Sequence, residues 1–360
     1  MAAIRDVARR AGVSVASVSR VINGSPLVNE PVRLRVLQAM ADLEYFPSAP
    51  ARSLKGGRTK LLGVLLPELA NPFYGELADG IEEVAYEAGY CVILCNSHPH
   101  TCDGHPHSRS TEYLRILREH RVAGLIITAG LWDNGSSNFR APVVSVDHRL
   151  PGIDSVMLDN VSAGRLATEH LIALGHQRIA MVSGLLGTTS GRGRLVGYRR
   201  AMRDAGLPLD PTLQAGSPYT EDDARRLANR ILMVQDRPTA LVAATNQLTL
   251  GAIAAAADQG LSIPDDLALV GFDELGWTPS LISPLTTVKQ PTRALGAEAC
   301  RLVLERLNGY AGPVRRVYLP ATLAIRLSCR APLEAREPST MPFRLAFERM
   351  ARAAPAMTPV

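Results

Sequence analysis

Apolar residues at helical spacing mark a first short helix near the start of the chain. They are Ile4, Val7, Ala8 and Ala11. Their i, i+3, i+4, i+7 pattern is typical of an amphipathic helix. Gly12 follows directly, and a glycine after the last apolar position is a common helix end because it adopts left-handed backbone angles without strain. The pattern predicts a helix that ends at Gly12.

A second helix is predicted directly afterwards. Ser14 is suited to be its N-cap, because a serine hydroxyl can accept a hydrogen bond from a free backbone amide of the first turn. Its inward stripe consists of Val18, Val21 and Ile22. A largely different face carries Val15, Ala16, Ser19 and Arg20. The pair Asn23-Gly24 ends this helix, so half of it is predicted to pack and half to contact something else.

Asn29 and Pro31 begin a third helix, since proline fits the first turn and asparagine fits the cap. Its predicted inward stripe is Val36, Leu37, Met40 and Leu43. Three short helices with a tight turn between the first two are the plan of a helix-turn-helix, in which the second helix enters the major groove of DNA.

From Leu61 onward, short β-rich runs alternate with helical stretches. The predicted strands are 61–67, 90–96, 122–128, 142–148, 177–184, 239–245 and 267–273, and the predicted helices are 74–88, near 110–120, 165–174, 192–205 and one ending at Gly260. This alternation favours parallel sheets covered by helices. The pattern restarts near residue 165, so we expect two α/β lobes that enclose a cleft at the carboxyl ends of their strands.

Composition supports a soluble chain with an unevenly charged surface. The 360 residues are 46% hydrophobic, which is ample for packed cores, but no apolar run is long enough to cross a bilayer. No apolar signal segment follows Met1, so a cytoplasmic location is expected. Residues 1–60 hold ten Lys and Arg against four Asp and Glu, whereas the other 300 hold 29 against 30. A small basic head on a neutral body indicates a nucleic-acid-binding module joined to something that binds otherwise.

Two patterns suggest other chemistry. Gly191, Gly193 and Gly197 resemble a dinucleotide fingerprint, but the spacing is one residue too long and no acidic residue follows at the ribose position. The loop HPHTCDGHPH contains the candidate metal ligands His98, His100, Cys102, His105 and His107. A solvated loop is the alternative interpretation of that stretch. Known catalytic motifs are missing, so neither an enzyme nor a cofactor is expected.

The stretches IRDVARRAGVSVASVSRVINGS and YFPSAPARSLKGGRT resemble the DNA-binding head of the lactose repressor (LacI/GalR) family. The resemblance implies base contacts by Val15, Ala16 and Arg20, with helix packing or a solvated charge as the alternatives. It implies phosphate contacts by Ser14, Ser17, Ser19 and Asn23. It also implies that Leu54, in a hinge that becomes helical on operator DNA, wedges into the minor groove.

The body resembles the same family, and also the periplasmic sugar-binding proteins, in the stretches NPFYGEL, LVGYRRAM, LSIPDDLALVGFDE and LTTVKQP. The resemblance implies an effector cleft lined by Phe73, Tyr74, Asp147, His148, Ser190, Arg194, Tyr219, Asn246 and Asp273. Plain core packing is the alternative for the two aromatic residues, and a lobe-bridging salt link is the alternative for Arg194 and Asp273. Thr245-Asn246 replaces the family's usual Asn-Asp, which removes an anion and leaves both a sugar and a sugar acid open as the ligand.

The expected fold is therefore an all-α helix-turn-helix head plus hinge, followed by an α/β two-lobed, periplasmic-binding-protein-like body with parallel sheets. The expected domains are a head at 1–47, a hinge at 48–59, a body at 60–330 and a flexible tail at 331–360. Within the body, the N-lobe is expected at about 60–158 and 290–316, and the C-lobe at about 159–289 and 317–330. The expected function is a homodimeric, or possible tetrameric, transcription repressor that binds double-stranded operator DNA and a small effector. A transport-type sugar-binding protein is the alternative.

Overall fold

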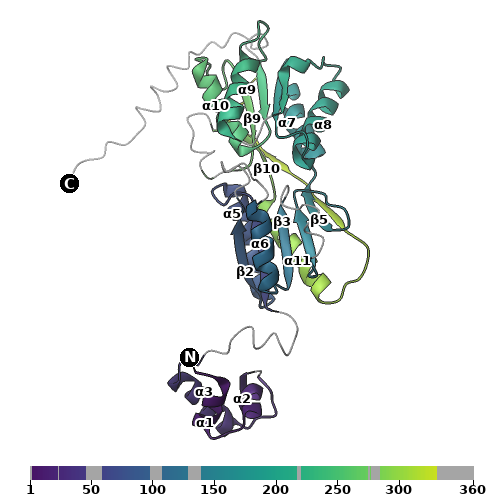
Figure 1. Ribbon diagram of the computed structural model, residues 1–360. Coiled ribbons are helices and arrows are strands. Elements are labelled where there is room, and N and C mark those ends of the chain that lie inside the picture. Colours follow the sequence, from purple (N-terminus) through teal and green to yellow (C-terminus); the bar gives the residue numbers. More distant parts are fainter. Residues whose placement is uncertain are drawn as a thin grey trace, which may run out of the picture.

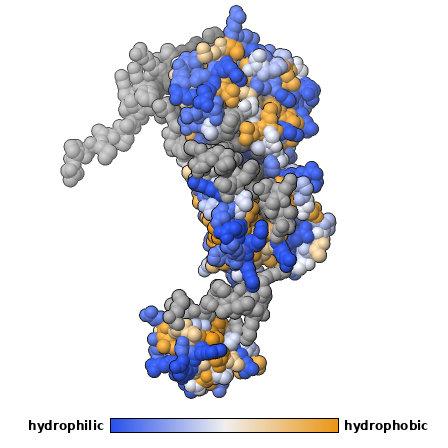
Figure 2. Space-filling model, viewed as in Figure 1, coloured by the Kyte–Doolittle hydropathy of each residue, from blue (hydrophilic) through white to orange (hydrophobic). Residues whose placement is uncertain are grey.

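The computed structural model describes residues 2–22, 24–45, 59–97, 108–128, 139–216, 220–274, 276 and 284–330. The chain forms a three-helix head and a body of two α/β lobes (Figure 1). On the face shown in Figure 2, hydrophilic residues predominate over the head and both lobes. Within the described residues, no helix is long and apolar enough to span a membrane.

The head consists of α1 (Ile4–Ala11), α2 (Val15–Ile22) and α3 (Glu30–Asp42). Gly12 ends α1 in the left-handed conformation, as predicted. The core of the head is made by Val7, Ala8, Ala11, Val18, Val21, Val36 and Ala39. The prediction that Leu37 belongs to this core is wrong: its side chain is 49% exposed, and the small residue Ala39 takes the inward position because α1 packs closely on α3.

The N-lobe contains a six-stranded parallel sheet in the order β11-β5-β4-β3-β1-β2. Its strands are β1 (Leu61–Leu66), β2 (Cys91–Asn96), β3 (Gly124–Thr128), β4 (Val143–Val146), β5 (Asp154–Leu158) and β11 (Arg316–Leu319). Helices α5 (Pro72–Glu87) and α11 (Thr292–Leu307) cover one face, and α6 (Ser108–Glu119) covers the other. Five consecutive buried residues, 62–66, run along β1 because helices cover both faces.

The C-lobe repeats this plan with the strand order β12-β10-β9-β8-β6-β7. Its strands are β6 (Ile179–Ser183), β7 (Gln214–Gly216), β8 (Ala240–Ala243), β9 (Ala268–Phe272), β10 (Thr286–Lys289) and β12 (Thr322–Ala324). Helices α7 (Asn160–Ala173) and α8 (Thr189–Asp204) cover one face, and α9 (Glu221–Leu232) and α10 (Asn246–Asp258) cover the other. A short 3-10 helix, η2 (Pro211–Leu213), precedes β7.

The chain crosses between the lobes three times, after β5, after β10 and between β11 and β12. The expected last boundary, near residue 316, cuts through β11. The structure puts this crossing after Leu319, because β11 pairs with β5 along its whole length. Only β12 runs antiparallel to its neighbour among the paired strands described.

Glycines let the helices of the C-lobe approach one another closely. A Cβ on Gly164 of α7 would lie 2.1 Å from the Arg194 carbonyl oxygen, and one on Gly197 of α8 would lie 2.1 Å from the Val161 carbonyl oxygen. Gly191 and Gly193 are also crowded, by the Leu185 carbonyl oxygen at 2.4 Å and by the Asn160 side chain at 2.7 Å. The apparent dinucleotide fingerprint is thus explained by backbone packing.

Candidate functional site

The second helix of the head presents the exposed face that the sequence predicts. The Ser17 backbone amide donates to Ser14 Oγ at 3.1 Å, so Ser14 caps the helix. Val15 is 41% exposed, and Ala16 and Arg20 are exposed as well, so core packing does not explain these three residues.

The remaining head residues are placed less fully. Ser17 and Ser19 are half-buried on the same helix. Asn23 and Leu54 lie outside the described residues. Helix α2 and its cap therefore offer a short exposed apolar pair, the exposed guanidinium of Arg20 and three hydroxyl-bearing side chains to an external partner.

The body carries two aspartates at equivalent positions of its two lobes. Asp147 follows β4 of the N-lobe, and Asp273 follows β9 of the C-lobe. Both adopt left-handed backbone angles, with φ values of 60° and 71°. The amide of each donates to a neighbouring strand at 3.0 Å, Asp147 to the Val156 carbonyl and Asp273 to the Val288 carbonyl. Aspartate is among the few residues that tolerate this conformation, which aims both carboxyls from the carboxyl ends of their sheets.

Arg194 of α8 is buried and held rigidly inside the C-lobe. Its Nε donates to Asn160 Oδ1 at 2.8 Å, its Nη1 donates to the Ala244 carbonyl, and its guanidinium lies 4.5 Å from the centre of the Phe272 ring. Nη2 makes no hydrogen bond to any described residue. The lobe-bridging salt link considered for Arg194 and Asp273 is wrong, because both residues belong to the C-lobe and no ion pair joins them among the described residues.

Two asparagine side chains join the lobes. Asn246 Nδ2 donates to Asn71 Oδ1 at 2.7 Å, and Asn71 Nδ2 donates back to Asn246 Oδ1 at 3.4 Å. Asn71 is also the N-cap of α5, where its Oδ1 accepts from the Phe73 amide. The Asn246 amide donates to Asp273 Oδ2 at 3.1 Å, and Gln290 Nε2 donates to Asp273 Oδ1 at 2.5 Å. Asn246 therefore connects the Asp273 carboxylate to Asn71, which caps α5 on the other lobe.

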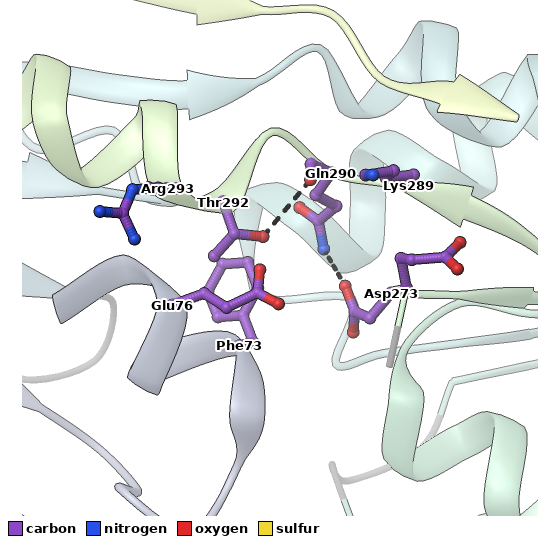
Figure 3. A pocket seen from close by; sticks show the side chains of 8 residues that line it. Phe73, Glu76, Asp273, Lys289, Gln290, Thr292 and Arg293 are labelled. Atoms are coloured by element: carbon purple, nitrogen blue, oxygen red, sulfur yellow. Dashed lines mark hydrogen bonds between the residues drawn. The ribbon is translucent and has the colours of Figure 1, made fainter. Parts of the chain in front are cut away.

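A cavity of about 330 Å³ opens beside these residues, between α5 and the crossover from β10 to α11 (Figure 3). Its lining comprises Phe73, Glu76, Asp273, Glu274, Lys289, Gln290, Thr292 and Arg293. Phe73 and Tyr74 meet edge to face at 5.1 Å between ring centroids. Phe73 lines the cavity, whereas Tyr74 packs partly on the N-lobe core, so core packing accounts for one of the two rings only.

His148 and Ser190 complete the group on the opposite side of the interlobe space. The His148 carbonyl accepts from Ser145 Oγ at 2.6 Å, and its Nδ1 lies 3.5 Å from Thr189 Oγ1 at the start of α8. Ser190 hydrogen bonds to the Asp147 carboxyl. Residues of the N-lobe thus meet the first turn of α8 from the C-lobe.

Three carboxyl groups around this space have raised pKa values. Burial raises the pKa of Asp147 and of Asp273, and the charge of Arg194 opposes the rise in both cases. Burial and the negative charge of Asp273 raise the pKa of Glu76. The charge of Lys289 opposes the rise for Glu76, but desolvation outweighs the nearby cationic groups at all three carboxyls.

Several site residues were not predicted from the sequence. Asn71, Asn160 and Gln290 hold the functional side chains, and Glu76 and Lys289 line the cavity. Asn71 carried a readable signal, because Asn followed by Pro is a helix start. Tyr219 and the candidate metal ligands His98, His100, Cys102, His105 and His107 lie outside the described residues.

Comparison with known proteins identifies both parts of the chain. Residues 3–48 match the family described as bacterial regulatory proteins, lacI family, and residues 168–329 match a periplasmic binding protein-like domain. The chain is 35% identical over 334 residues to the HTH-type transcriptional regulator DegA of Bacillus subtilis, covering 90% of this chain and 97% of that protein. It is also 35% identical to the HTH-type transcriptional repressor PurR of Photobacterium profundum, covering 92% and 99%.

A solved structure of the lac repressor dimer bound to operator and the anti-inducer ONPF superposes with a TM-score of 0.80 and 29% identity, over 92% of this chain and 99% of that one. The relatives are transcription regulators, which favours regulation over the transport-type alternative. The chain therefore belongs to the lacI family of bacterial regulatory proteins and is a helix-turn-helix transcription regulator of the repressor type, with an effector-binding body.

Proposed function

We propose that the head reads an operator with the exposed face of α2. Val15, Ala16 and Arg20 are exposed on that face, and a guanidinium can pair with two acceptors of guanine. Ser14, Ser17 and Ser19 supply hydroxyls for phosphate contacts, and Asn23 is proposed to do the same. Arg20→Ala is expected to cost about 1–3 kcal/mol on the preferred duplex and to relax base preference there. An unchanged preference would contradict the assignment.

The domain division that we propose is a head at 1–47, a hinge at 48–59 and a two-lobed body at 60–330. Two copies act together, with one head on each half of a palindromic site and Leu54 of each hinge in the minor groove. The similarity to a repressor dimer on its operator supports this arrangement. Since a transcription regulator acts where the DNA lies, the compartment that we propose is the cytoplasm.

The cleft is proposed to bind a neutral, hydroxyl-rich effector, a sugar rather than a sugar acid. The observation that carries this choice is that burial raises the pKa of three carboxyl groups in this space despite the nearby cationic side chains of Arg194 and Lys289. Asp147 and Asp273 can accept from ligand hydroxyls, Arg194 Nη2 can donate, and Phe73 offers a ring for the apolar face of a sugar. A carboxylate on the ligand would place a further acidic group beside these three.

The effector is proposed to act by changing how the lobes meet, and no catalytic step is involved. Asn71 and Asn246 join the lobes directly, so a ligand between them shifts the equilibrium between open and closed bodies. In a dimer, the shift changes the separation of the two hinges, and the operator is bound or released accordingly.

Matched ligand pairs test the proposed effector class. The protein is screened by thermal shift against neutral sugars and against their acid counterparts, such as glucose and glucuronate, since a bound ligand raises the melting temperature by mass action. We expect the stabilising compounds to be neutral, and the Asp273→Asn variant to lose the shift. Stabilisation by acids alone would overturn the choice.

A further inference from the structure

The amino ends of the parallel strands of the N-lobe share one edge of the sheet. The backbone connects them there: the Cys91 amide donates to the Lys60 carbonyl, the Ala123 amide to the Leu61 carbonyl, and the Ser155 amide to the Arg315 carbonyl. The chain arriving from the head enters the body at this edge, because β1 is the first strand and begins at Leu61. This edge is the part of the body tied most directly to the DNA-binding head.

Five exposed cationic side chains lie along this edge, and we call them the amino-edge patch. They are Lys60, Arg118, Arg121, Arg140 and Arg316. Each belongs to the segment that enters a strand: residue 60 leads into β1, 118 and 121 into β3, 140 into β4, and 316 begins β11. The sheet order β11-β5-β4-β3-β1 spreads them across almost its whole width. Four different segments therefore contribute positive charge to one surface.

The charges of the patch are not neutralised by the described part of the protein. No ion pair forms between any of the five and a described acidic residue, and Lys60 lies 4.2 Å from the centre of the Tyr90 ring instead. Glu119 on the same edge is already paired with Arg115. Glu87, at the end of α5 and shortly before β2, forms no ion pair with a described residue. Positive charge therefore remains in clear excess.

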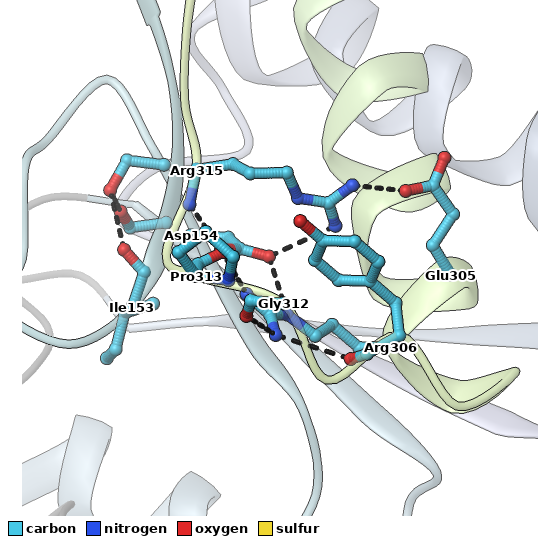
Figure 4. A network of polar contacts seen from close by, with 10 residues as sticks. Ile153, Asp154, Glu305, Arg306, Gly312, Pro313 and Arg315 are labelled. Atoms are coloured by element: carbon cyan, nitrogen blue, oxygen red, sulfur yellow. Dashed lines mark hydrogen bonds and ion pairs between the residues drawn. The ribbon is translucent and has the colours of Figure 1, made fainter.

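Two other arginines at the same edge, Arg306 and Arg315, stabilise the fold through ion pairs with a buried carboxylate. The buried Asp154 carboxylate accepts from Arg306 at 2.8 and 2.9 Å and from Arg315 at 3.2 Å, and both guanidiniums lie over the Tyr310 ring (Figure 4). Arg315 also pairs with Glu305. This network fastens the end of α11 to β5 and β11. The patch residues have no such partners, so stabilising the fold does not explain them.

We propose that the amino-edge patch is a second DNA-binding surface, which contacts phosphates flanking the operator core without reading sequence. Its positive charge complements the duplex, and it lies at the edge where the chain from the DNA-binding head enters the body. Residues 46–58 join the head to this edge, and such a segment spans at most about 45 Å. A head bound to the core therefore holds the patch close to the neighbouring phosphates at high effective concentration.

The test removes charge while keeping side-chain length. The triple variant Arg118→Gln, Arg140→Gln, Arg316→Gln is compared in the full-length protein with a control triple, Arg200→Gln, Arg203→Gln, Arg230→Gln. The control arginines are exposed on the C-lobe helices and have no ion pair with a described residue. Their replacement removes the same charge as the patch variant does. Binding is measured against salt on a duplex that the protein itself selects from a random library. One form carries flanks of about one helical turn, about 10 base pairs, and the other is trimmed to the selected core.

On the flanked duplex, the slope of log affinity against log salt is expected to be shallower by about 2 for the patch variant than for the unaltered protein. Such a slope change alters the affinity ratio by about 16-fold between about 50 and 200 mM salt. The control triple should match the unaltered protein, and all three proteins should bind the trimmed duplex alike. Equal losses for both triples, or equal losses on both duplexes, would overturn the proposal, and so would an unchanged slope. An acidic protein or a second copy of the chain as the partner would give that last result.

Discussion

The amide pair between Asn71 and Asn246 is a direct hydrogen-bonded contact between the lobes, so its removal probes the proposed switch. Asn71→Ser is the suitable change. Serine is also a good N-cap, so the start of α5 keeps its hydrogen bond to the Phe73 amide while the bridge to the other lobe is lost. Asn246→Ala removes the same bridge from the C-lobe side.

The magnitude follows from the two distances. The bond from Asn246 Nδ2 at 2.7 Å is a full hydrogen bond, and the return bond at 3.4 Å is at the outer limit. One net hydrogen bond is worth about 1 kcal/mol, because both amides reach water when the lobes separate. That free energy corresponds to about a fivefold change in the ratio of closed to open bodies.

A donor and an acceptor dye, one on each lobe, report the open and closed populations of the full-length protein. Each single variant is expected to shift the population ratio about fivefold toward the open body, and the double variant should shift it no further. Asn71→Ala serves as the control that loses both bridge and cap, so it should also melt earlier than Asn71→Ser. Additive shifts in the double variant, or no shift in either single variant, would refute a functional bridge.

Three further predictions follow from the same structure. At neutral pH and without effector, Asp147→Asn should raise the free energy of unfolding, because the neutral amide does not carry the desolvation penalty of the buried carboxylate. Burial raises the pKa of the Asp147 carboxyl above its ordinary value of 3.8, so the folded state binds a proton that the unfolded state has already lost. The unaltered protein therefore loses stability as the pH rises from about 3.8 through the raised pKa, whereas the amide variant does not. A urea titration at several pH values checks this, and a lower stability of the variant at neutral pH would contradict it. Gly164→Ala should destabilise by about 1–3 kcal/mol, because the new Cβ would lie 2.1 Å from the Arg194 carbonyl oxygen, whereas Gly187→Ala, with open space around it, should be nearly neutral. Ser14→Ala should raise the hydrogen-exchange rates of the α2 amides about fivefold by removing a cap worth about 1 kcal/mol.

Periodicity predicted most of the fold because burial follows it closely. The apolar stripe of α1 and the continuous apolar run of β1 are both buried as expected. The prediction that Leu37 is buried was wrong because helical spacing alone does not distinguish a large residue at the edge of an apolar stripe from Ala39 at its centre. In a small head, the close approach of α1 and α3 decides which of the two fits.

The last part of the body was harder to predict because its elements are short and pair with distant segments. β11 and β12 lie near one another in the chain, yet they join different sheets. Likewise, Asn71 and Asn246 stand 175 residues apart, so only the fold brings their amides together. Resemblance to the family supplied the aspartates and Arg194, but not the groups that hold them, such as Asn160 and Gln290.

The decisive measurement is the binding of the full-length protein to DNA with and without a stabilising sugar. The measurement is the ratio of its affinity for the selected duplex to its affinity for bulk competitor DNA at fixed salt. We expect a ratio of about 10³ or more, which changes at least severalfold when the sugar fills the cleft and no longer changes in the Asp273→Asn variant. A ratio near one under every condition would contradict it.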